Sequence, residues 1–421
     1  MSVALVTVLA LVAALALSVV SRTNIGIIAL AAAWLIGVYV AQDAPKAVIA
    51  GFPLGLFITL TGTSLLFAVV ALTGVLARLA AAAVAALGNS VRALPLVFFA
   101  IAMLVSASGA GAIASVALIV PLAATMARQH GLPPMLTALM VANGANAGNL
   151  SPVSVVGIIA NSRMAEAGIV GHETLVMMTN LLVHVLVAAA AYAWFMLRSA
   201  SPVATGAAGQ ALPRTGAWSS REIATLLVLM AWIAGVLIAG FDLGLSAFAA
   251  AAILILARCA DEAATIRHVP WGVILMVCGV ATLVALAEAN GGTELFAKLI
   301  AAVATPGSIN AIIAFVTGVI SSYSSTSGVV LPTFLPVVPE LVRQLGGGDP
   351  LAIALSINVG ASLVDVSPLS TLGALCIASL TDGDAGRALF HRLLIWGFAM
   401  TLVSALFCLW VVPWLAGSFA T

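Results

Sequence analysis

The sequence predicts an all-α integral membrane protein made of two related five-helix units in inverted orientation, each with a re-entrant hairpin and a broken helix. Of its 421 residues, 63% are hydrophobic and only 7% are charged, whereas average domains contain about 25% charged residues. Apolar segments of roughly 20 residues, long enough to cross a bilayer as a helix, recur along the chain. Two segments also repeat one another: Asn-Leu-Ser-Pro-Val-Ser-Val-Val-Gly begins at Asn149, and Asp-Val-Ser-Pro-Leu-Ser-Thr-Leu-Gly begins at Asp365.

Ten apolar segments are long enough to serve as transmembrane helices. In the first half these are residues 2–20, 23–41, 52–77, 132–162 and 174–197. In the second half they are residues 221–240, 242–260, 269–288, 349–380 and 390–416. The first segment lacks the basic start and the cleavage site of a signal peptide, so we interpret it as the first transmembrane helix.

Two further apolar stretches, residues 95–128 and 308–344, are each interrupted near the middle by small residues at 106–111 and 321–328. Glycine and serine permit a tight reversal of the chain. We therefore expect each stretch to form a re-entrant hairpin that enters and leaves the membrane on one side. The alternative is an ordinary pair of helices with small residues at their packing faces.

The repeated motif interrupts two of the predicted crossings. Three asparagines, two glycines and a proline fall within residues 143–152, a composition that predicts an unwound helix. Pro152 suits the first turn of a new helix with Ser151 as its cap, and Ser367 and Pro368 repeat this design. Free backbone groups at such a break attract anions at the new helix N-terminus and cations at the preceding carbonyl groups.

The polar segment 199–220 divides the chain into halves with five crossings and one hairpin each. Because five is odd, the second half is expected to be inserted upside down. If the N-terminus is placed outside, 11 of the 15 lysines and arginines lie on the cytoplasmic side and four lie outside. Because cytoplasmic loops carry an excess of lysine and arginine, this orientation, with both termini outside, is the one we expect. These four residues are Lys46, Arg163, Lys298 and Arg343.

Composition also excludes several functions. The net charge of +1 gives no basic patch for nucleic acid. The four cysteines lie far apart without metal-ligand spacing, so we expect inert packing residues: Cys259, Cys278, Cys376 and Cys408. Neither HExxH nor GxSxG occurs, so the chain is not expected to be an enzyme, and no cofactor is expected apart from coupling ions.

The polar residues of the hairpins and breaks are oxygen-rich, with no lysine or arginine in these portions. Asp365 is the single formal charge in the broken-helix motifs, and a buried carboxylate requires a proton or a cation. Hard oxygen ligands suit sodium, so sodium is the expected counter-ion, with a proton as the alternative. Asparagines of the first half and hydroxyl groups of residues 324–327 would supply further oxygens. The plainer interpretation is that these side chains only satisfy the interrupted backbone.

The hairpin tips and the two Ser-Pro breaks resemble the ion transporter superfamily, in particular the divalent anion:sodium symporters and the malonate/dicarboxylate carrier-like permeases. The resemblance covers essentially the whole chain and implies one anion site flanked by sodium sites, where the tips meet the unwound helices. From the resemblance together with the break residues themselves, we expect substrate contacts from Ser108, Gly109, Asn149, Ser151, Ser325, Thr326 and Ser367. The sodium ligands would be Ser106, Asn143, Asn146, Ser327, Asn358, Ser362 and Asp365. The tips lack the Ser-Asn-Thr signature of better-known members, which favours a smaller or less charged anion held by backbone amides.

The resemblance also implies an elevator-type motion and a homodimer. Residues 1–92 and 221–306 would form the static scaffold halves, and residues 199–220 would form the cytoplasmic loop between the two repeats. Residues 93–198 and 307–421 would form the moving transport halves. These contain hairpins at 95–128 and 308–344 and broken helices at 132–164 and 349–380.

The expected function is sodium-coupled import of a small dicarboxylate, such as malonate or a C4 acid, across a bacterial-type inner (plasma) membrane. The partners are then a small anionic substrate and the lipid bilayer. One alternative is a sodium/proton antiporter or an arsenite exporter of the same superfamily, with Asp365 as the exchanging carboxylate. Another is an anion channel or a membrane subunit that depends on a soluble partner.

Overall fold

The computed structural model describes residues 2–21, 23–76, 78, 82, 92–198, 217–322, 325–381 and 383–418, which form helices and turns without a β-strand. The predicted loop 199–220 and tip residues 323 and 324 therefore lie wholly or largely outside the described residues. The helices α1–α4 and α11–α15 belong to the segments expected as scaffold. Their bounds are α1 Val3–Ser21, α2 Ile25–Tyr39, α3 Pro45–Ala50, α4 Leu54–Thr73, α11 Ser220–Ala239, α12 Leu243–Leu256, α13 Glu262–His268, α14 Trp271–Ala289 and α15 Gly292–Ala301.

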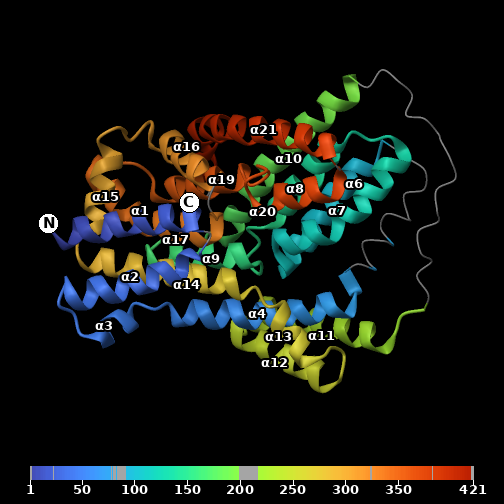
Figure 1. Ribbon diagram of the computed structural model, residues 1–421, viewed down its shortest axis with the longest axis horizontal. Coiled ribbons are helices and arrows are strands. Elements are labelled where there is room, and N and C mark those ends of the chain that lie inside the picture. Colours follow the sequence, from blue (N-terminus) through green and yellow to red (C-terminus); the bar gives the residue numbers. More distant parts are fainter. Residues whose placement is uncertain are drawn as a thin grey trace.

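The remaining helices belong to the segments expected to carry the site. In the first half they are α6 Leu94–Val105, the wide turn η1 Ser106–Ala110, α7 Gly111–His130, α8 Pro134–Gly148, α9 Val155–Glu166 and α10 Glu173–Arg198. In the second half they are α16 Ile309–Ser321, η2 Thr326–Val330, α17 Leu331–Phe334, η3 Leu335–Val337, α18 Val338–Leu345, α19 Pro350–Leu363, α20 Thr371–Leu380, α21 Gly383–Trp410 and α22 Val412–Ser418. Figure 1 shows α4 with α11–α13 along the lower edge and α8, α10 and α21 along the upper part.

Six described helical segments are long and apolar enough to cross a membrane, which makes this a multi-pass membrane protein. Four of them coincide with predicted crossings: Leu54–Thr73, Glu173–Leu197, Trp271–Ala289 and Asp384–Ser418. Two belong to the predicted hairpins: Leu94–His130 and Thr326–Leu345. Several other predicted crossings form shorter apolar helices; residues 349–380, for example, form two half-helices, α19 and α20.

The two halves interlock through glycine contacts between scaffold helices. A Cβ atom on Gly26 of α2 would lie 2.1 Å from the carbonyl oxygen of Leu275 in α14, and one on Gly279 would lie 2.2 Å from the carbonyl oxygen of Gly26. In the same way α12 packs on α4, where a Cβ on Gly62 would lie 2.3 Å from the carbonyl oxygen of Gly244. Each half therefore supplies two helices that pack closely against the other half.

The helices that precede the two breaks also pack through equivalent glycines. A Cβ on Gly144 of α8 would lie 2.3 Å from the carbonyl oxygen of Phe99 in α6. A Cβ on Gly360 of α19 would lie 2.4 Å from the carbonyl oxygen of Ala314 in α16. These glycines permit backbone-to-backbone contact and hold each first hairpin arm against its broken helix.

The first predicted hairpin reverses direction at the expected place, and the helix of the second is interrupted at the expected place. In the first, the Ser115 hydroxyl on α7 donates to the Ala102 carbonyl on α6 over 2.7 Å, so the two arms run side by side. The reversal uses Gly109 with φ +118° and Gly111 with φ +77°, conformations that L side chains rarely adopt. In the second, the hydroxyl groups of Ser321 and Thr326 lie 2.6 Å apart and connect α16 to η2.

All four cysteines are buried and free, as the sequence predicted. The apolar core consists mainly of two large clusters, and each contains side chains from both halves of the chain. One includes Leu60, Ile159, Ile274, Phe334 and Leu355; the other includes Leu66, Phe98, Leu139, Leu254 and Leu393. The breaks lie between helices held on both sides by this core, so their positions are determined by tertiary packing.

Candidate substrate and ion site

The helix breaks are shorter than the sequence predicted. Helix α8 continues through Asn143 and Asn146 as far as Gly148, and α9 begins at Val155. The interruption is therefore confined to residues 149–154, and the first six residues of the polar run 143–152 remain helical. Close packing of Gly144 and Gly148 against α6 keeps these residues helical despite their low helix propensity. The second break is similarly short, because α19 ends at Leu363 and α20 begins at Thr371.

The capping residues are also different from those expected. Ser154 and Ser370 cap the new helices, accepting hydrogen bonds from the backbone N–H groups of Gly157 and Gly373. Ser151 was wrongly expected as the cap; its carbonyl accepts from the Ser154 hydroxyl over 3.0 Å. Pro152 and its counterpart Pro368 lie in the turn that precedes each new helix, two residues before the capping serine.

The same hydrogen bonds close both turns. The Ser154 hydroxyl donates to the carbonyl of Asn149, and the Ser370 hydroxyl donates to the carbonyl of Asp365. A Cβ on Gly157 would lie 1.9 Å from the Ser151 carbonyl oxygen, and a Cβ on Gly373 would lie 2.2 Å from that of Ser367. The repeated Ser-Pro-x-Ser-x-x-Gly pattern thus encodes one compact turn twice. The carbonyl groups of Asn149 and Asp365, where the two turns begin, already accept a hydrogen bond from a serine hydroxyl.

A cavity of about 630 Å³ brings the two tips and the two breaks together. Its wall includes six of the predicted site residues: Gly109, Asn149, Ser325, Thr326, Ser327 and Asp365. Scaffold helices complete the wall through Ser64 and Phe67 of α4 and Val273 and Met276 of α14. The cavity therefore lies between the segments expected to move and those expected to stay fixed.

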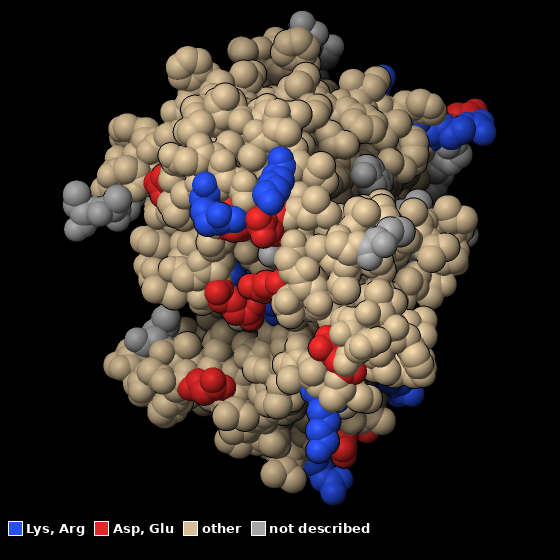
Figure 2. Space-filling view, turned by 90° about the vertical axis from the view of Figure 1, so that its left-hand side faces the viewer, with Lys and Arg blue, Asp and Glu red and all other residues tan. Residues whose placement is uncertain are grey.

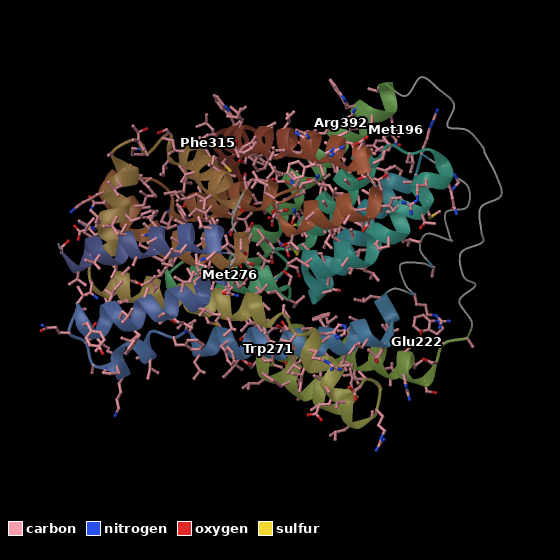
Figure 3. The ribbon with its side chains drawn as sticks, in the orientation of Figure 1. Met196, Glu222, Trp271, Met276, Phe315 and Arg392 are labelled. Carbon is pink, nitrogen blue, oxygen red and sulfur yellow. The ribbon has the colours of Figure 1, made fainter. Side chains whose placement is uncertain are left out.

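Each hairpin tip is covered by a scaffold side chain at a glycine. A Cβ on Gly109 would lie 2.0 Å from the ring of Phe67, and a Cβ on Gly328 would lie 2.5 Å from the side chain of Met276. Met276 lies near the middle of the molecule along its long axis, whereas Glu222 lies at one end (Figure 3). The tips thus meet the scaffold deep inside the protein, through apolar contacts.

Each tip is also connected to the break of its own half. The backbone N–H of Ala112 donates to the Asn149 side-chain oxygen over 3.2 Å. In the second half, the Thr326 hydroxyl forms a hydrogen bond with the Asp365 carboxyl group, which is half-buried at the cavity wall. Equivalent positions therefore carry a neutral amide in one half and a carboxyl group in the other.

The other predicted site residues lie outside this cavity. Ser108 donates its hydroxyl to the Val105 carbonyl over 2.8 Å, and the Ser367 hydroxyl accepts from the N–H of Leu369 over 3.3 Å. Asn358 contacts the sulfur of Met164. Ser106, Asn143, Asn146, Ser151, Asn358, Ser362 and Ser367 are all buried and do not line the cavity.

Several of these buried residues retain oxygen atoms without a partner: the Ser106 hydroxyl and the side-chain carbonyls of Asn143, Asn146 and Asn358. Buried polar groups normally have hydrogen-bond partners, so unpaired oxygens of this kind fit a hard monovalent cation such as sodium. No group of three or more His, Cys, Asp or Glu side chains suited to a metal ion occurs within the described parts of the chain.

A second cavity of about 590 Å³ lies further along the same two helices, α9 and α14. Its charged wall residues are Arg163, Glu166, Glu288, Glu340 and Arg343. Arg163 contacts Glu166 at 2.6 Å, and Arg343 contacts Glu340 at 2.6 Å and Glu294 of α15 at 3.5 Å. Figure 2 looks onto an end of the molecule where acidic and basic side chains gather around a hollow in a mostly uncharged surface.

Several residues of the main cavity and its support were not predicted from the sequence. Phe67 and Met276 lie in apolar crossings where nothing distinguishes them from core residues. Asn180, a buried amide in α10, contacts both broken helices; its position inside an apolar segment was the only available signal.

Comparisons with known proteins agree with this architecture. Residues 1–149 match the family model described as the dicarboxylate carrier protein MatC N-terminus, which confirms the resemblance to dicarboxylate carrier-like permeases over this part of the chain. The crystal structure of the Alcanivorax borkumensis YdaH transporter superposes with a TM-score of 0.60 and 16% sequence identity, covering 89% of this chain and 88% of that one. At this identity the match shows a shared fold. No curated protein matches the chain.

Proposed function

We propose that this protein is a secondary-active transporter that imports a small dicarboxylate, such as malonate or a C4 acid, together with sodium. The observation that carries the proposal is the 630 Å³ cavity, in which both hairpin tips and both helix breaks meet. Irregular backbone at membrane depth is tolerated where it lines a cavity, and transporters place substrate sites at such breaks. The match of the first 149 residues to a dicarboxylate carrier supports the substrate class.

The charges of the cavity support cation coupling. Among the described residues that line it, none is lysine or arginine, Asp365 is the one carboxylate, and His268 is the one other titratable side chain. A dicarboxylate dianion beside an ionised Asp365 would bring three negative charges into a site without a fixed cation. Such charge is costly unless it is compensated, so cations have to enter with the substrate. Sodium ions at the unpaired oxygens are our first choice, and a proton on Asp365 is the alternative.

The contacts of the tips support an elevator-type motion between two inverted halves. The tips meet α4 and α14 through the apolar side chains Phe67 and Met276, without a described ion pair at these contacts. Apolar contacts of this kind can slide without breaking specific bonds. Residues 93–198 and 307–421 would move against residues 1–92 and 221–306. We further expect a homodimer in a bacterial-type inner membrane with both termini outside.

The test is uptake of radiolabelled malonate and succinate into proteoliposomes, with and without an inward sodium gradient. Thr326→Val removes a hydroxyl from the cavity wall and should abolish most of the sodium-dependent uptake. Ser108→Ala is the matched control, because the Ser108 hydroxyl lies in the other tip, outside the cavity wall, and donates to the backbone carbonyl of Val105. Ser108→Ala should leave the half-saturating substrate concentration unchanged.

The outcomes separate the alternatives. Uptake driven by a proton gradient alone would keep the cavity and replace the coupling ion. Sodium/proton exchange without dicarboxylate uptake, lost in Asp365→Asn, would replace the proposal with an antiporter. Uptake that continues after both gradients have collapsed, with no accumulation against a gradient, would indicate a channel instead.

A further inference from the structure

We infer that Asn180 is a positioning residue, which sets the relative placement of the two helix breaks through one buried side-chain amide. This inference rests on the proposed function only for its transport readout. Asn180 lies in α10, outside both hairpins and both broken helices, and its side chain is fully buried. The amide contacts both halves of the chain within this interior.

The nitrogen of this amide binds the first broken helix. Asn180 Nδ2 donates to the Asn146 carbonyl oxygen over 2.7 Å and lies 3.5 Å from that of Ala147. The same Asn146 carbonyl accepts the backbone N–H of Asn149, the break residue that lines the cavity, over 3.1 Å. A shift of Asn180 would therefore act on the turn that places Asn149.

The oxygen of the amide binds the second broken helix. The Ser362 hydroxyl donates to Asn180 Oδ1 over 2.7 Å. The carbonyl of Ser362 accepts the backbone N–H of Asp365, the break residue of the second half, over 3.2 Å. Asn146 and Ser362 each lie three residues before their break residue, so the amide joins equivalent positions of the repeat.

The orientation of the amide follows from its partners. A backbone carbonyl such as that of Asn146 can only accept a hydrogen bond, so the NH₂ group has to face it and the amide oxygen has to face the Ser362 hydroxyl.

The second half has no copy of this amide, because the position equivalent to Asn180 at the same spacing of 216 residues (365 minus 149) is Trp396 in α21. The indole N–H of Trp396 has no partner. One side chain therefore makes the connection for both halves.

The connection explains how two turns far apart in sequence can form one cavity wall. Asn149 and Asp365 line the same cavity although they lie in different helix breaks. Without the amide, the Asn146 carbonyl and the Ser362 hydroxyl would each lose a partner in an apolar interior, where unpaired polar groups are costly. The two broken helices would then settle at a different separation.

The test uses Asn180→Leu and Ser362→Ala, with Thr179→Val as the matched control. Thr179 is the adjacent residue, equally buried, and its hydroxyl has no partner, so its loss leaves both breaks untouched. Asn180→Leu should raise the half-saturating dicarboxylate concentration about tenfold, the size expected when a buried hydrogen bond is lost and its partner left unsatisfied. Thr179→Val should keep the wild-type half-saturating concentration. Ser362→Ala removes only the hydrogen bond to the second broken helix, so its value should lie between those of Asn180→Leu and Thr179→Val.

A second readout does not depend on transport. Leu369 lies within the second break, lines the cavity and is 51% exposed, while all four native cysteines are buried. The rate at which a maleimide labels Leu369→Cys should therefore change at least about threefold with Asn180→Leu and less with Ser362→Ala. Equal labelling rates in the Asn180→Leu, Thr179→Val and parent backgrounds would overturn the inference. If the wild type transports no dicarboxylate, the proposed function fails and the labelling result still decides the role of Asn180. If Asn180→Leu does not fold, Ser362→Ala decides alone.

Discussion

Replacing Gly109 by a larger residue should destabilise the folded protein for two independent reasons, and experiments can separate them. Its φ of +118° is a conformation that L side chains rarely adopt, which costs about 1–3 kcal/mol. A Cβ atom would also lie 2.0 Å from the ring of Phe67, and overpacking of this kind costs about 1–3 kcal/mol. Gly109→Ala should therefore destabilise the first hairpin tip by about 2–6 kcal/mol in total.

Substitutions at two other glycines measure the backbone strain and the steric contact separately. Gly111 has φ +77° but nothing within 4 Å of its Cβ position, so Gly111→Ala carries the backbone cost alone. Gly328 has no positive φ, and its Cβ would meet the flexible end of Met276. Because methionine repacks easily, Gly328→Ala should cost at most about 1 kcal/mol.

The assay is the midpoint of heat-induced loss of the monodisperse peak in detergent, measured by fluorescence-detected size-exclusion chromatography. The midpoint should fall most in Gly109→Ala, less in Gly111→Ala and least in Gly328→Ala. Adding Phe67→Leu should recover part of the loss in Gly109→Ala and none in Gly111→Ala, since only the first variant meets the ring. A Gly109→Ala midpoint equal to the wild-type value, or equal recovery in both backgrounds, would refute the reasoning.

Three further outcomes follow from the same structure. Ser154→Ala and Ser370→Ala each remove a helix cap and should cost about 1 kcal/mol, seen as similar falls of the melting midpoint; no fall in either would contradict the capping role. Asp365→Asn should reduce the number of charges moved per substrate, measured as current against radiolabel uptake, and an unchanged ratio would exclude this carboxylate from coupling. Arg343→Ala removes mostly exposed ion pairs with Glu340 and Glu294 and should change stability by less than about 1 kcal/mol; a larger fall would contradict the small contribution expected of exposed ion pairs.

The turns at the two breaks show how local sequence can specify a structure. The spacing Ser-Pro-x-Ser-x-x-Gly recurs at Ser151 and Ser367, and both copies form the same capped turn. A proline, a capping serine and a close glycine act over a few residues, so their effect is present in the sequence itself. The identity of the cap was nevertheless misjudged, because Ser151 and Ser154 are both suitable residues and only the folded turn distinguishes them.

Tertiary packing decided which of the motif residues reach the cavity. Asn143 and Asn146 belong to the same polar run as Asn149, yet they remain in α8 and stay buried away from the cavity. Their helical state depends on contact with α6, which no local pattern encodes.

The sequence by itself determined the membrane class, the repeated Ser-Pro motif and the place of the first hairpin tip, because hydrophobic length and small flexible residues act locally. Only the tertiary structure decided that Phe67 and Met276 cover the tips and that Asn180 joins the two breaks. These contacts connect residues distant along the chain, and an apolar or amide side chain has no local signature until its partner is in place.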